Sequence, residues 1–481
     1  MTLSTVRLGT ADGELAKALA AIRAELGVSE GFPPEVEAEA REAVAFAAHP
    51  EDHSAESAAY EDLLDVPFFT IDPAESMDLD QAMHLERDGT GYRVRYAIAD
   101  VPAFVKPGGA VDAEARRRGQ TLYPPDGRIP LHPLVISEEA ASLLPGAERG
   151  AYVWTFELDA DARLVSTRLT RARVRSERRF SYDEVQELVD GGSAPENLAL
   201  LREVGLARIL IEQERGGASL GRPDQEIREQ DGRYELVRRR PLEAEGWNAQ
   251  ISLLTGMAAA QLMLDGGVGI LRTMPPPSDD SIVWFRRRAT ALGTAWEEGV
   301  GYGAYLRMLD PADPRQLAIL HAAASLFRGA GYTAFDGAPP EHPVQSAVAA
   351  PYAHATAPLR RLVDRFVLVV CEALANGREV PEWARAALPD LPAIMASSDG
   401  LAGRLDYAAT SAVEAAVLRP RVGERFAATV ISTRNGGGEL QLEDPAVTAH
   451  GEGRLVAGER VAATLVTADI ATGTVLFRVG G

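Results

Sequence analysis

The chain has 481 residues, of which 46% are hydrophobic and 25% charged, so it has material for roughly two to four globular domains. Its net charge of −21 argues against a protein that coats nucleic acid nonspecifically, although a local basic channel inside an acidic shell is still compatible with it. A single cysteine excludes an internal disulfide. There is no run of about 18 apolar residues and no signal peptide, so we expect a cytoplasmic protein without a membrane segment.

Residues 1–60 predict a small helical unit. Apolar side chains recur at helical spacing and would share one face: Leu15, Leu19, Ile22 and Leu26. Gly27 suits the end of that helix, and Pro34 suits the first turn of a second one. The pattern assigns this unit no function, and we expect it to pack against the rest of the chain.

Residues 61–415 predict one large mixed α/β domain. The segment VPFFTID at 66–72 is typical of a short apolar strand that ends on a carboxylate. Residues 92–98 alternate as in a half-buried strand, and similar alternation covers 152–180. Helical periodicity then dominates from about 198 to the end of this domain.

Residues 420–481 predict a small closed β-barrel. Short strands are separated there by glycine-rich turns, as barrels of this size require. We identify four of them from the sequence: FAATVIST, GELQLED, RVAATLVTAD and GTVLFRV.

The chemistry is expected in TIDPAESMDLDQAMHL, residues 70–85, where Asp72, Asp78 and Asp80 lie close together in the chain. Asp78 and Asp80 are two apart, so an extended backbone would point them the same way. Three crowded carboxylates repel one another and need a compensating cation. Oxygen donors suit Mg²⁺, with Mn²⁺ as a substitute, and such an ion would activate water in phosphoryl transfer.

Two other interpretations of these aspartates remain open. A calcium loop of the EF-hand type is disfavoured, because the segment lacks that loop's glycine at position six and glutamate at position twelve. The aspartates would otherwise be exposed loop residues without a common function.

The same segment resembles the signature of the RNase II / RNase R family, the RNB-domain exoribonucleases, which reads T-I-D, five residues, then D-x-D-D-A. Further blocks follow in the family's order. YAIADVPAFVKPGGAVDAEARRRGQTLYPPDGRIPLHP resembles the block containing I-A-D-V, R-G and Y-x-P-D-x-x-I-P. RSERRFSYDEVQ and PYAHATAPLRRLVDR resemble the next two. The resemblance spans about residues 60–415, and the terminal barrel resembles the family's five-stranded OB-fold RNA-binding domain.

The resemblance implies a processive 3′-to-5′ exoribonuclease that hydrolyses single-stranded RNA to nucleoside 5′-monophosphates with the help of Mg²⁺. RNA would thread a basic channel to a buried site, and we expect a monomer. The expected barrel holds no aromatic residues besides Phe426 and Phe477, so base stacking on it would be limited.

Matching residue by residue, the resemblance implies that Asp72, Asp78, Asp80 and the residue at 81 surround the metal, and that Asp80 is most closely tied to cleavage. Arg360 matches an arginine near the scissile phosphate, where it would stabilise the transition state. An ion pair from Arg360 to Asp364, four residues on, is the alternative.

Three further residues would contact RNA by the same resemblance. Tyr123 matches a tyrosine that stacks on the terminal base, and a core tyrosine is the alternative role. Arg361 is a further RNA-binding candidate, and Glu414 matches a late glutamate near the last nucleotide.

Gln81 departs from the family pattern, which has a fourth aspartate there. An amide can still bind a metal through its oxygen, but it carries no charge, so metal affinity should be weaker. Three hypotheses therefore stand: an exoribonuclease, a catalytically impaired RNA-binding member of the same family, and an unrelated metal phosphoesterase acting on small molecules.

Overall fold

The computed structural model describes residues 12–47, 60–218, 224–230, 233–239, 241–434, 436–445 and 447–480. Residues 1–11 and 48–59 of the expected N-terminal unit lie outside this described part. The remainder of that unit is helical, as predicted: α1 spans Asp12–Leu26 and α2 spans Pro34–Ala47. Gly27, at φ +65°, allows the chain to leave α1 in the left-handed conformation.

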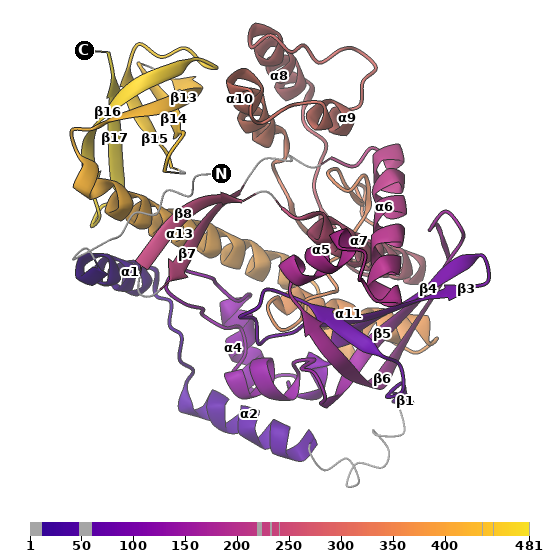
Figure 1. The fold of residues 1–481 in the computed structure, drawn as a ribbon. Coiled ribbons are helices and arrows are strands. Elements are labelled where there is room, and N and C mark those ends of the chain that lie inside the picture. Colours follow the sequence, from indigo (N-terminus) through magenta and orange to yellow (C-terminus); the bar gives the residue numbers. More distant parts are fainter. Residues whose placement is uncertain are drawn as a thin grey trace.

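A six-stranded sheet forms the first half of the large domain (Figure 1). Its strands run in the order β1-β6-β2-β3-β4-β5, and β6 also pairs with β5, so the sheet turns back on itself. The strands are β1 (Glu61–Asp62), β2 (Phe68–Ile71), β3 (Gln81–Asp88), β4 (Gly91–Ala99), β5 (Glu148–Leu158) and β6 (Leu164–Phe180). Large buried side chains such as Tyr96, Trp154 and Phe156 fill its core.

The connection from β4 to β5 carries three short elements and the loop that later borders the site. The elements are a 3₁₀ turn η2 (Val101–Ala103), α4 (Ala110–Arg118) and a π-helical turn η3 (Val135–Ala140). Arg118 ties this connection to the N-terminal unit, because its guanidinium donates to the Gly31 carbonyl and covers the Phe32 ring.

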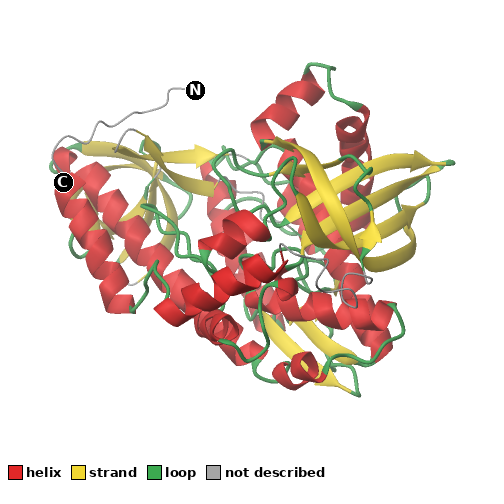
Figure 2. Cartoon of the chain, turned by 90° about the horizontal axis from the view of Figure 1, so that it is seen from below, coloured by secondary structure: helices red, strands yellow, loops and turns green. Residues whose placement is uncertain are grey.

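The second half of the domain is mainly helical (Figure 2). They are α5 (Tyr182–Asp190), α6 (Glu196–Arg215), α7 (Glu243–Gly266), α11 (Leu362–Ala375), α12 (Glu382–Ala387) and α13 (Leu391–Leu418). Helices α7 and α11 pack in the main core with the sheet residues. A small hairpin of β7 (Asp224–Gln230) and β8 (Arg233–Arg239) precedes α7.

Gly256 in α7 permits a close approach of the chain segment that leads into α11. A Cβ at this position would lie 2.1 Å from the Tyr352 ring and 2.6 Å from the Ala353 carbonyl oxygen. The Ala353 amide in turn donates to the Gly256 carbonyl at 3.0 Å. A larger residue would push this segment, which carries Arg360, away from α7.

A second helical group lies between β9 (Val268–Thr273) and β10 (Gly331–Asp336), two paired strands followed by the short pair β11 (Val344–Gln345) and β12 (Ala350–Pro351). The group has its own small core around Phe285. It consists of α8 (Asp279–Ala291), α9 (Tyr302–Arg307), α10 (Pro314–Ala323) and the 3₁₀ turn η4 (Ala324–Leu326). Hydrogen bonds connect this group to the barrel: Arg288 donates to the Ile431 carbonyl, and His321 pairs with Gln441.

The C-terminal region is a closed five-stranded barrel, as predicted, and follows α13 through the turn η5 (Arg419–Arg421). Its strands are β13 (Arg425–Arg434), β14 (Gly437–Leu442), β15 (Thr448–Gly453), β16 (Arg460–Asp469) and β17 (Thr474–Val479). Sequence analysis missed β15, since TAHGEG has no apolar alternation. Phe426 and Phe477 are both buried and pack edge to face, so they offer no stacking surface.

Helix α1 lies along α13, and Leu15 and Leu19 bury their side chains in one cluster with α13 and barrel residues (Figure 1). Within the described residues, none of the helices has the length and apolar character needed to cross a membrane.

Candidate active site

Three segments that are distant in sequence meet at one end of the sheet. The first is the loop of residues 72–80 between β2 and β3, and its start is fixed because the Asp72 amide donates to the Phe180 carbonyl at 3.1 Å. The second is residues 119–129 after α4. The third is residues 352–361 before α11. The second and third segments pair directly, since the Thr121 amide donates to the Arg360 carbonyl at 2.9 Å.

Asp80 is the most buried carboxylate of the loop, with a relative exposure of 3%. Its Oδ1 accepts a hydrogen bond from the Leu359 amide at 2.7 Å, and its Oδ2 lies 3.4 Å from Nε of Arg360. Burial raises the pKa of Asp80 to about 8, although Arg360 and the Leu359 amide act in the opposite direction. The carboxylate is therefore held in one orientation and short of compensating positive charge.

Asp72 is also desolvated. Burial raises its pKa to about 7, with Arg360 and Arg179 lowering it and Asp78 raising it further. Among the described residues no hydrogen-bond partner reaches its buried Oδ2. An unsatisfied carboxylate oxygen beside two other acidic groups is a natural ligand position for a cation.

Asp78 has a different environment. Its Oδ1 pairs with Nη1 of Arg128 at 2.6 Å and accepts a hydrogen bond from the Ser76 hydroxyl at 3.2 Å. Arg128 also pairs with Glu138 on η3. The sequence analysis did not single out Arg128, because it lies 50 residues from Asp78 along the chain.

Gln81, the first residue of β3, turns its side-chain amide towards the third segment. Its Nε2 donates to the Thr356 carbonyl. Thr356 is itself positioned by α11, since its amide donates to Asp364 Oδ1 at 2.9 Å. The side-chain amide at position 81 thus links β3 to the segment that carries Arg360. An ionised aspartate at this position would have no hydrogen to donate and could not form this bond.

The two neighbouring arginines have different roles in the structure. The proposed alternative of an Arg360–Asp364 ion pair is wrong: Asp364 pairs with Arg361 instead, at 2.8 Å, and accepts two backbone amides. Burial would raise the pKa of Asp364, but Arg361 outweighs it and keeps the pKa below its usual value. Arg360, with a side chain 44% exposed, is left facing the carboxylates.

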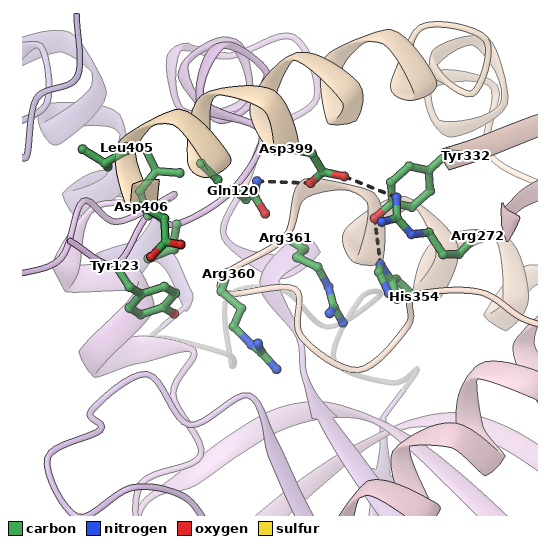
Figure 3. Close-up of a pocket in the computed structure, with 13 residues that line it drawn as sticks. Gln120, Tyr123, Arg272, Tyr332, His354, Arg360, Arg361, Asp399, Leu405 and Asp406 are labelled. Carbon is green, nitrogen blue, oxygen red and sulfur yellow. Dashed lines mark hydrogen bonds and ion pairs between the residues drawn. The ribbon is translucent and has the colours of Figure 1, made fainter. Parts of the chain in front are cut away.

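A cavity of about 370 Å³ opens beside Arg360 and Arg361 (Figure 3). Tyr123 lies at one end of it and is exposed, so the alternative of a core tyrosine is wrong. At the other end the Tyr332 hydroxyl pairs with Nδ1 of His354 at 2.7 Å. Burial, followed by the nearby Arg361, holds the pKa of His354 well below its usual value, which favours the neutral imidazole.

Helix α13 contributes acidic side chains to the cavity that sequence analysis did not name. Asp399 binds Gln120 at 3.2 Å and Arg272 at 3.3 Å, and Asp406 lies near Tyr123 (Figure 3). Glu414 is two turns farther along α13, buried, and does not line this cavity. Its predicted contact with RNA, like the predicted RNA contacts of Tyr123 and Arg361, stays a prediction.

The donors fit a hard divalent cation in kind, because Asp72, Asp78 and Asp80 supply carboxylate oxygens and Gln81 an amide. They are not arranged as a ready-made site: within the described ranges, no group of three or more His, Cys, Asp or Glu side chains is disposed to hold a metal ion. Two of the three carboxylates face an arginine: Asp78 pairs with Arg128, and Asp80 lies beside Arg360.

Comparison with known families gives two matches. The model described as RNB domain matches residues 60–376, and the model described as RNase II-type exonuclease C-terminal S1 domain matches residues 424–480. The RNB match covers more than half of the chain and lies in the large domain, and the S1 match covers the barrel.

Among curated proteins, the chain is similar to exosome complex exonuclease RRP44 homolog A of Arabidopsis thaliana, with 29% identity over 64% of this chain and 34% of that protein. It is similar to ribonuclease R of Chlamydia muridarum, with 30% identity over 56% of this chain and 40% of that protein. The chain thus spans about a third of the length of the curated relatives it matches.

Among solved structures, Mycoplasma genitalium RNase R in complex with ribose methylated single-stranded RNA has a TM-score of 0.85 at 18% identity, covering 98% of this chain and 79% of that one. Yeast Ssd1, a pseudonuclease, has a TM-score of 0.68 at 16% identity, covering 86% and 54%. At these identities the likeness concerns the fold.

Proposed function

This chain belongs to the RNB-domain family of exoribonucleases, and from that premise we propose that it is a processive 3′-to-5′ exoribonuclease, which hydrolyses single-stranded RNA to nucleoside 5′-monophosphates in a Mg²⁺-dependent reaction. The single observation that carries the proposal is the position of Arg360 between the desolvated carboxylate of Asp80 and a cavity bordered by Tyr123.

Asp72, Asp78 and Asp80 would hold the divalent cation, with the Gln81 amide at the edge of the group. When bound, the cation would supply Lewis-acid stabilisation and a more acidic water. Desolvation of Asp72 and Asp80 supports this, because both carboxylates bear charge at a cost that a cation would offset.

The protein groups divide the remaining tasks. The Leu359 amide orients Asp80 through a 2.7 Å hydrogen bond, leaving Oδ2 toward Arg360. Arg360 is half-exposed and can bind a phosphate through paired hydrogen bonds, stabilising the charge that develops during hydrolysis. Tyr123 offers an exposed ring on which a terminal base can stack without regard to its identity.

The test uses the full chain with a 5′-labelled single-stranded RNA and Mg²⁺. The expected result is shortening from the 3′ end with release of 5′-monophosphates, and no shortening of the DNA of the same sequence. Asp80→Asn should lower the cleavage rate about a hundredfold or more, since it removes the charge that orients the attacking water, while RNA affinity is retained. Unchanged turnover by this variant would refute the role given to Asp80.

A catalytically impaired RNA-binding protein is the second candidate. Gln81 removes one carboxylate from the family pattern, and the chain also shares its fold with the pseudonuclease Ssd1. RNA binding without shortening, at every Mg²⁺ concentration, would favour this candidate. Membership of the RNB family counts against the third hypothesis, a phosphoesterase acting on small molecules. The cytoplasmic location and the monomeric state stay predictions.

A further inference from the structure

Arg128 brings a positive charge into the acidic cluster. Its Nη1 lies 2.6 Å from Oδ1 of Asp78, and its guanidinium also pairs with Glu138. The Asp78 side chain is only 9% exposed and the Arg128 side chain 24%, so water screens this pair weakly. This charge-assisted pair should therefore be stronger than an exposed ion pair.

The loop around Arg128 is fixed from both sides. Leu122 and Ile129 exchange two backbone hydrogen bonds of 2.9 Å at its base, and both side chains are buried. At its tip, Asp126 pairs with Arg23 of helix α1 at 2.5 Å. Because the backbone on either side of Arg128 is held, its guanidinium reaches Asp78 with little loss of conformational entropy.

Two features of this cluster lower the negative charge available to a cation. At position 81 the carboxylate of the family signature is replaced by a neutral amide. At position 128, which the signature leaves open, a guanidinium contacts Asp78 and occupies one of its oxygens directly.

We propose that Arg128 is a positioning residue that competes with the divalent cation for Asp78, and so sets the metal affinity of this site. The proposal rests on the proposed function, because it takes Asp78 to be one of the metal-holding carboxylates. A guanidinium and a divalent cation on one carboxylate repel each other, and metal binding must displace Arg128 towards Glu138 or share Asp78 with it.

Whether metal affinity rises or falls when Arg128 is removed distinguishes this role from a merely structural one. If Arg128 only kept the loop in place, its removal would disorder Asp78 and weaken metal binding. If Arg128 competes for Asp78, its removal frees an oxygen and removes a repelling charge, so metal binding becomes tighter.

The experiment compares the full chain with Arg128→Gln by titration calorimetry with Mg²⁺ and by electron paramagnetic resonance of bound Mn²⁺, both without RNA. The variant is expected to bind either ion about tenfold more tightly or better, given the size of a charge–charge interaction at this range. Arg128→Lys keeps the charge and should move the affinity less. Arg163→Gln is a matched control, because Arg163 forms an exposed pair with Glu214, and it should change nothing.

The outcomes distinguish this proposal from the proposed function. If the wild-type protein binds the ions and Arg128→Gln binds them equally tightly or more weakly, the role of Arg128 is overturned, whereas the metal site is supported. If neither protein binds the ions, the metal site itself fails, and the role of Arg128 fails with it. If only Arg128→Gln binds the ions, Arg128 excludes the cation from the wild-type site, and the proposal is supported. Should Arg128→Gln fail to fold by circular dichroism, Arg128→Met, of similar length, takes its place in the same comparison.

Discussion

Metal affinity should rise steeply with pH, since two of the three carboxyl groups that would bind the cation, Asp72 and Asp80, have pKa values raised to near neutrality or above. The pKa of Asp72 is raised to about 7 and that of Asp80 to about 8, both chiefly by burial. A raised carboxyl pKa means that the neutral form persists below it, and a metal ligand must be ionised. Binding therefore strengthens as pH rises through 7 and 8, and weakens as it falls.

The size of the effect follows from the two pKa values. At pH 6 about one-tenth of Asp72 and about one-hundredth of Asp80 would be ionised, whereas both are largely ionised at pH 9. A cation that requires both carboxylates should accordingly bind about a thousandfold more weakly at pH 6 than at pH 9.

Calorimetric titration with Mg²⁺ between pH 6 and pH 9, in buffers of different ionisation enthalpy, measures the affinity and the protons released together. About two protons should leave per ion bound at pH 6, and almost none at pH 9. In Asp80→Asn the part of the pH dependence above pH 7 should disappear. An affinity that varies less than about tenfold over this range, or binding without proton release, would refute the reasoning.

Three other substitutions test separate parts of the structure. Gln81→Asp should lower the Mg²⁺ concentration for half-maximal cleavage, because it restores a charge to the cluster, and an identical metal titration would show that position 81 does not interact with the cation. Tyr123→Ala should weaken binding of single-stranded RNA by about 1–3 kcal/mol while Tyr123→Phe does not, as measured by fluorescence anisotropy; equal losses would point away from stacking. Arg365→Ala should lower the free energy of unfolding in urea by about 3–5 kcal/mol, because it leaves the buried Asp112 without its main partner, and a loss below about 1 kcal/mol would contradict this.

Local sequence was sufficient for the elements whose pattern is periodic. Strand β2 with its terminal carboxylate, the alternation of β4, and α1 with its end at Gly27 all follow from short-range rules of burial and backbone conformation. Strand β15 was missed because its residues are held by pairing with β14 and β17, and its own composition carries no signal.

The sequence by itself determined the family, the mixed α/β domain with its C-terminal barrel, and the loop that carries Asp72, Asp78 and Asp80. Only the tertiary structure decided how these side chains are paired. It assigned Asp364 to Arg361 and left Arg360 beside Asp80, and it placed Arg128 on Asp78 across 50 residues of chain. The physical reason is that charge pairing depends on the distance between the groups and on their burial in the folded protein. Neither quantity can be predicted from the local sequence pattern.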